Sequence, residues 1–159
     1  MSAPVVVFAV GNPSRGDDAI GPACYGQLEK WLENENLGEQ VDLIEDFQLN
    51  IEHALDLQGR RLAIFIDAGE NTPAPYVFRP IERSPIASHS THALPPESVL
   101  QVYWQMEGRE PPPSWLLCVR GESFELGAEL SATVLDRLPG AIGEVQRAIR
   151  QAVSEGCPA

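Results

Sequence analysis

The chain has 159 residues, and 23 acidic against 11 basic residues give it a formal net charge of −12. This length suits one compact domain, and a hydrophobic content of 43% is too high for a disordered acidic segment. Eleven Lys and Arg are too few to form the basic patch that nucleic-acid binding needs. We therefore expect one globular domain over residues 1–159, with residues 154–159 as a frayed tail and no nucleic-acid partner.

Cysteine use and hydropathy predict the compartment. Cys24, Cys118 and Cys157 are too few and too scattered for a disulfide framework, and an odd number suits a reducing compartment. The first residues lack the basic segment of a secretory signal, and no apolar run approaches the roughly 18 residues of a membrane helix. We expect a soluble cytoplasmic protein with no membrane partner, a monomer by default.

Apolar runs alternate with helical periodicities along the chain. The run VVVFAV over Val5–Val10 predicts a strand buried on both faces, as in a parallel sheet. Helical spacing follows over residues 19–35, with Asp17 or Asp18 as the expected N-cap. The other expected elements are a strand at 41–44, a short helix at 50–57, a strand at 62–66, an edge strand at 76–78, a helix at 96–106, a strand at 115–119 and a helix at 131–153, broken or kinked near Pro139.

This order of elements predicts an α/β fold. Strands that alternate with helices form a mostly parallel sheet covered by helices on both faces. We expect a three-layer sandwich around a twisted five-stranded sheet with one edge strand. In such sheets, binding sites form at the carboxyl ends of the strands.

The loop after the first strand has the glycine spacing of a phosphate loop but the wrong charge. Gly11 and Gly16 are five residues apart, yet Asp17 and Asp18 stand where a phosphate loop has Lys and Ser or Thr. Two carboxylates at a helix N-terminus would repel a phosphate, which argues against nucleotide binding. One carboxylate is enough to cap the helix, so the other of the two is free to point into the crevice at the strand ends.

Asp67 ends another buried strand. If that strand lies beside the first, Asp67 and Asp18 emerge together at neighbouring strand ends. Two converging carboxylates need a cation, a shared proton or a catalytic task. Alone, Asp67 is as well explained by a hydrogen bond to its own turn.

A polar loop supplies two histidines, His89 and His92, just before the helix at 96–106. Combined with the carboxylates, His92 would complete a set of Asp18, Asp67 and His92 suited to a borderline divalent metal such as nickel or zinc. His53 lies in the short helix after Asn50 and is expected to be structural. The residues alone lead to a possible metal-binding hydrolase and no further.

Three motifs together resemble the hydrogenase maturation endopeptidases. The first runs Gly11-Asn12-Pro13-x-x-Gly16-Asp17-Asp18-x-x-Gly21, the second is Asp67-Ala68 at a strand end, and the third is Ser90-x-His92-x-Leu94. The resemblance extends to Gly121-Glu122-Ser123 and Leu130-Ser131. The stretch from Glu45 to His53 is similar to the subgroup that serves cytoplasmic NAD(P)-linked bidirectional hydrogenases, although Asn50 stands where that subgroup more often has Gln.

The resemblance implies a function. Such enzymes remove a C-terminal extension from the nickel-loaded large-subunit precursor of NiFe hydrogenases, and the family residues associated with metal match Asp18, Asp67 and His92. Nickel would come with the substrate, with no organic cofactor. Asp18 or Asp67 would serve catalysis, and Asp46, Gln48 and His89 would bind substrate. A metallochaperone that does not cleave, and a hydrolase with its own resident ion, are the alternatives.

Overall fold

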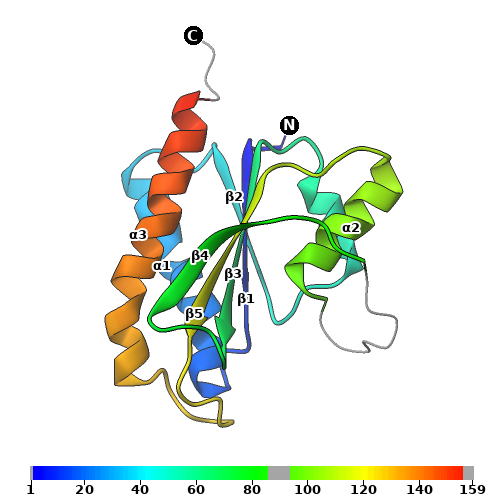
Figure 1. Cartoon of the computed structure of the whole chain (residues 1–159). Helices are drawn as coiled ribbons and strands as arrows, with labels where there is room; N and C mark the ends of the chain where they lie inside the picture. The colour runs from blue at the N-terminus through cyan, green and yellow to red at the C-terminus, as the bar shows by residue number, and fades with distance from the viewer. Residues whose placement is uncertain (1, 86–93, 156–159) are drawn as a thin grey trace.

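The structure is a computed structural model that describes residues 2–85 and 94–155 (Figure 1). A single five-stranded sheet forms its centre, in the order β2-β1-β3-β5-β4. β4 is antiparallel to β5, and the other neighbouring strands are parallel. The strands are β1 (Val5–Val10), β2 (Val41–Asp46), β3 (Leu62–Gly69), β4 (Tyr76–Ile81) and β5 (Ser114–Arg120).

Helices cover both faces of this sheet, which gives the three layers seen in Figure 1. One face is covered by two long helices, α1 (Ile20–Asn34) and α3 (Ala132–Glu155). The other is covered by α2 (Pro96–Glu107) and the short 3-10 helix η2 (Ile51–Leu57). A second 3-10 helix, η1 (Gly16–Ala19), joins the end of β1 to α1.

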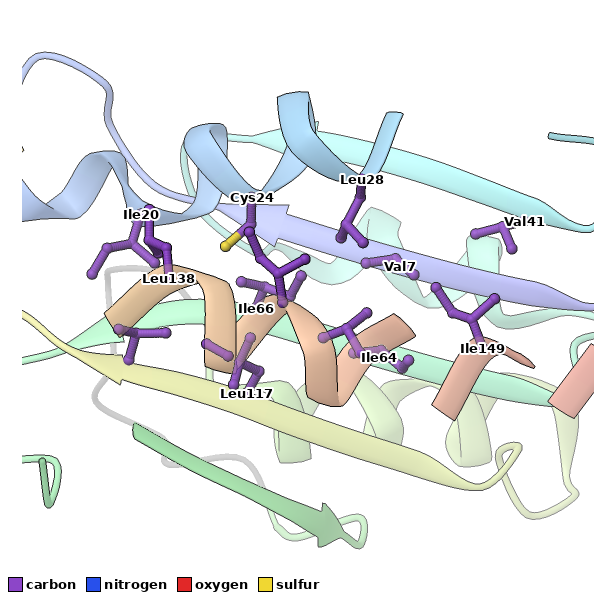
Figure 2. Close-up of a cluster of buried hydrophobic side chains, with 14 of the residues drawn as sticks. Val7, Ile20, Cys24, Leu28, Val41, Ile64, Ile66, Leu117, Leu138 and Ile149 are labelled. Atoms are coloured by element: carbon purple, nitrogen blue, oxygen red, sulfur yellow. The ribbon is translucent and has the colours of Figure 1, made fainter. Parts of the chain in front are cut away.

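The alternation of side chains along β1 explains why the sheet has a core on each face. Val5 and Val7 belong to the cluster under α1 and α3, whereas Val6 and Phe8 belong to the cluster under α2 and η2. All four are fully buried. Figure 2 shows the first cluster, in which side chains from α1 and α3 meet those of the central strands. Burial on both faces is why VVVFAV contains no polar residue.

The predicted α/β architecture, mixed edge strand included, is confirmed. Two details of the prediction are wrong. The last helix is not broken near Pro139, because α3 continues through this exposed residue as one helix, while a kink there stays a prediction. The N-cap residues are Arg15 for η1 and Ala19 for α1, and neither aspartate of the pair caps a helix.

The order of the strands in the sheet determines where a binding site can form. β1 lies between β2 and β3, and the connection through α1 covers one face while the connection through η2 covers the other. The strand order therefore reverses between β1 and β3, and in open α/β sheets a binding site is expected at the carboxyl ends of the two strands at such a reversal. Within the described residues, no helix is long and apolar enough to cross a membrane.

Candidate active site at the carboxyl ends of β1 and β3

Asp18 and Asp67 lie at the strand-order reversal. Ala9 of β1 is paired with Ile66 of β3, so Asp67 follows directly where β1 ends. Asp18 lies in η1, which begins six residues after the end of β1. The charge of Asp18 acts on the Asp67 carboxyl and raises its pKa. The predicted convergence of these two carboxylates is therefore present in the structure.

Within residues 2–85 and 94–155, each of the two carboxylates accepts one hydrogen bond. The backbone N–H of Asn12 donates to Oδ2 of Asp18 at 2.7 Å, and the backbone N–H of Ala68 donates to Oδ1 of Asp67 at 2.8 Å. These bonds fix the position of one oxygen of each side chain. Both side chains are partly accessible.

Asp67 is electrostatically unusual. Burial raises the pKa of this carboxyl, the Ala68 N–H lowers it, and the nearby charge of Asp18 raises it further, to about 7. A carboxyl with this pKa exchanges its proton near neutral pH, which general acid–base catalysis requires. A cation between the two carboxylates would favour their charged forms.

Asp17 has the opposite surroundings, although it is the neighbour of Asp18. Its side chain is completely buried. Oδ2 accepts from the N–H groups of Glu122 (2.7 Å) and Ser123 (3.0 Å), and from Oγ of Ser131 (3.0 Å), while Oδ1 accepts from the Ser131 N–H (2.7 Å). Burial alone would raise its pKa, but these four donors outweigh that effect and lower it.

Backbone bonds complete the attachment of η1 to the segment 121–131. The N–H groups of Gly16 and Asp17 donate to the carbonyls of Ala128 (3.0 Å) and Ser123 (2.7 Å). Gly16 has φ +56°, and a Cβ there would lie 2.4 Å from the Ser123 carbonyl oxygen. Glycine is therefore required both by conformation and by space. This segment holds η1, and with it Asp18, in one position.

Asp46, at the end of β2, has intramolecular partners for both oxygens. Oδ1 accepts from the Phe47 N–H at 2.7 Å, and Oδ2 lies 3.4 Å from Nε2 of His53. His53 is buried and accepts from the Asn50 N–H through Nδ1 at 2.9 Å. His53 thus has the structural role that the sequence predicts. The substrate-binding role of Asp46 and of the exposed Gln48 stays a prediction.

The two predicted loop histidines, His89 and His92, lie outside the described residues. The described chain resumes at Leu94, whose N–H donates to the Leu49 carbonyl at 3.1 Å. Among the residues that are described, no three His, Cys, Asp or Glu side chains form a metal-binding group. The third member of the predicted set therefore stays a prediction.

Cys118 neighbours Asp67 in the sheet but has no sign of activation. The two residues are register partners on β5 and β3, and Sγ lies 3.0 Å from Oγ1 of Thr72. Burial raises the pKa of this thiol, so it stays protonated at neutral pH. A thiol that stays protonated is a poor nucleophile.

A hollow of about 760 Å³ lies away from the carboxylates, at the amino ends of the strands. It is bounded by the C-terminal half of α3 and by Leu62, Phe78 and Trp115. Its charged lining residues are Arg61, Glu144, Arg147 and Glu155. Their charges cancel, and nothing connects this hollow to Asp18 and Asp67.

Sequence reasoning missed the role of Asp17, to which it assigned at most a helix cap. The donors to Asp17 lie 105 to 114 residues further along the chain, so no local pattern reveals them. One signal was present, because the motif that resembles the maturation endopeptidases includes Glu122, Ser123 and Ser131. Its distant parts meet at Asp17.

No family model and no curated protein matches the chain. Solved structures do resemble it. The hydrogenase maturating endopeptidase HybD from E. coli is 23% identical, with a TM-score of 0.70 over 96% of this chain and 94% of that chain. The NiFe hydrogenase maturation protease HycI from Thermococcus kodakarensis KOD1 is 19% identical, with a TM-score of 0.69 over 93% of each chain.

A third similar structure is the hydrogenase 2 maturation peptidase from Thaumarchaeota archaeon SCGC_AB-539-E09. It is 24% identical, with a TM-score of 0.64 over 91% of this chain and 97% of that chain. At these identities the likeness is one of fold. The fold is an α/β sandwich, and these solved hydrogenase maturation proteases share it over more than nine-tenths of the chain.

Proposed function

We propose that this chain is an endopeptidase that removes the C-terminal extension from the nickel-loaded large-subunit precursor of a NiFe hydrogenase. The observation that carries the proposal is the convergence of Asp18 and Asp67 at the strand-order reversal. The fold shared with solved hydrogenase maturation proteases supports it. The resemblance of three sequence motifs to that family supports it independently.

In this proposal the nickel is part of the substrate. Asp18, Asp67 and His92 engage the ion that the precursor carries, so that only a loaded precursor is positioned for cleavage. Carboxylate and imidazole are suitable partners for a nickel ion that thiolates already hold, because they add ligands without competing for the softer ones. Asp46, Gln48 and His89 bind the surrounding polypeptide.

Cleavage requires a water molecule and a proton acceptor. Asp67 takes a proton from the water as its oxygen attacks the scissile carbonyl carbon, and a proton then passes to the leaving amine nitrogen as the C–N bond breaks. Asp18 is the second carboxylate; the Asn12 N–H holds it in place, and it shares the cation with Asp67.

We also propose the hydrogenase subgroup, the compartment and the oligomeric state. The stretch from Glu45 to His53 assigns the chain to the subgroup for NAD(P)-linked bidirectional hydrogenases, and the site of action is the cytoplasm. The enzyme works as a monomer that binds its precursor transiently. Cleavage assays with precursors of different hydrogenase groups test the first of these statements directly.

The experiment that tests the proposed function is incubation of the purified chain with nickel-loaded and nickel-free precursor. Mass spectrometry of the precursor should show the loss of a C-terminal peptide from the loaded form alone. Binding of the loaded form without any loss of mass would instead indicate a metallochaperone. A stoichiometric metal in the purified chain would favour a hydrolase with a resident ion.

A further inference from the structure

Three large apolar side chains are exposed one after another beside the candidate active site. Phe47 is 65% exposed, Ile51 61% and Leu55 56%. They follow the end of β2 at intervals of four residues, the last two on the outer side of η2. We call these three residues the η2 ridge. Three large apolar side chains exposed within nine residues are more than chance exposure of single residues, and they indicate a surface that another molecule covers.

The ridge is held rigidly. Phe47 is fixed through its N–H by Asp46, and the next residues turn inward, since Leu49 is buried in the core under α2. Asn50 then begins η2 in a capping box with His53, in which each side chain accepts a hydrogen bond from the other end of the turn. The exposure of the ridge is therefore built into the fold, and little ordering is needed when a partner binds.

The charges around the ridge indicate the chemistry of its partner. Residues 45–59 contain no Lys or Arg and four acidic residues, Glu45, Asp46, Glu52 and Asp56, whereas Asp42 further back on β2 is paired with Arg60. Exposed apolar side chains elsewhere differ, since Trp104 lies 4.1 Å below the guanidinium of Arg83. An apolar ridge in an acidic surround complements apolar side chains that are flanked by Lys and Arg.

The ridge is continuous with the candidate active site. The Gly11 N–H donates to the carbonyl of Asp46 at 3.0 Å, which ties the end of β2 to the loop after β1. The next residue of that loop, Asn12, holds the Asp18 carboxylate. A polypeptide bound at Phe47 therefore lies next to the loop that positions Asp18, at the carboxyl ends of the strands.

We propose that the η2 ridge is the docking surface for the protein substrate and receives a segment of the precursor with apolar side chains flanked by Lys and Arg. This inference rests on the proposed function. Because the ridge contacts the body of the precursor and not the reacting atoms, it sets the KM of cleavage and leaves the chemical step unchanged. Apolar anchors of this kind dominate the affinity of protein interfaces.

The test is steady-state cleavage of the nickel-loaded precursor by the full chain and three variants. We expect Phe47→Ser and the double variant Ile51→Ser/Leu55→Ser each to raise KM about tenfold or more with kcat within about twofold of wild type. Leu135→Ser is the matched control, because Leu135 is 53% exposed but lies on α3, across the sheet. Its KM should stay within about twofold of wild type.

A further variant tests whether the acidic residues around the ridge attract the substrate. Glu52→Lys keeps the apolar side chains but should raise KM, with a weaker effect at high salt. An unchanged KM in both ridge variants while the wild type cleaves would overturn the docking inference alone. The same follows if sedimentation shows a wild-type dimer that the ridge variants dissociate. A wild-type chain that does not cleave would overturn the proposed function as well.

Discussion

Two carboxylates near the strand-order reversal, the fully buried Asp17 and the partly buried Asp67, have opposite electrostatic surroundings. Asp17 in η1 accepts four hydrogen bonds from the segment 121–131, and its pKa is lowered. Asp67 at the end of β3 accepts one, from its neighbour Ala68, and its pKa is raised to about 7. Burial disfavours the charge at both; four donors outweigh this effect at Asp17, whereas at Asp67 the Ala68 N–H does not and the charge of Asp18 adds to it.

Asp17 therefore stabilises the folded state, whereas the surroundings of Asp67 are those of a functional residue. A carboxylate with four donors stabilises the folded state wherever it is ionised. A carboxyl with one donor and a like charge nearby destabilises the folded state at neutral pH, and such a cost is typical of functional residues. Changing each aspartate to asparagine should therefore have opposite effects on stability.

The largest loss is expected for Asp17→Asn. The amide keeps one acceptor and turns an N–H₂ group toward donors, which should lower the free energy of unfolding by about 3 kcal/mol in urea denaturation. The pKa of Asp17 is lowered on folding, so its stabilisation is present above about pH 4 and is lost as the pH falls through the folded-state pKa. The difference between the two proteins should shrink on acidification, and a difference independent of pH would argue against this role.

Gly16→Ala should cost less, about 2 kcal/mol. The substitution puts a Cβ 2.4 Å from the Ser123 carbonyl at a residue with φ +56°, so η1 must move away from the segment 121–131. The control is Gly26→Ala in α1, where a Cβ meets no atom within 4 Å. Alanine favours the helix there, and the control should be slightly stabilised. Thermal unfolding measures both variants, and equal changes in their Tm would refute the packing argument.

Asp67→Asn should raise stability at neutral pH. The pKa of Asp67 is raised on folding, so the folded protein binds its proton more tightly and loses stability as the pH rises from about 4 to about 7. Asparagine removes this penalty, which we expect to be about 1–2 kcal/mol at pH 8 and absent at pH 4. Urea denaturation at the two pH values measures it. A variant less stable than wild type at pH 8 would contradict the account.

The sequence predicts the sheet and the two carboxylates well, for physical reasons. VVVFAV is apolar at every position because β1 is buried on both faces, and strand ends in parallel sheets bring Asp18 and Asp67 together. The role of Asp17 is not predictable locally, because its partners come from the far end of the chain. The uninterrupted α3 was missed because a proline on the exposed side of a helix is tolerated more easily than its average cost suggests.

We propose that Asp67 takes part in cleavage and lowers the stability of the folded protein at neutral pH. The most direct test of this proposal is the rate at which purified Asp67→Asn trims the nickel-loaded precursor, beside Asp18→Asn and His92→Ala, with circular dichroism to show that each variant is folded. We predict that Asp67→Asn is folded and more stable than wild type at pH 8, yet cleaves at least about 100-fold more slowly. Cleavage by Asp67→Asn and His92→Ala at the wild-type rate would contradict the account.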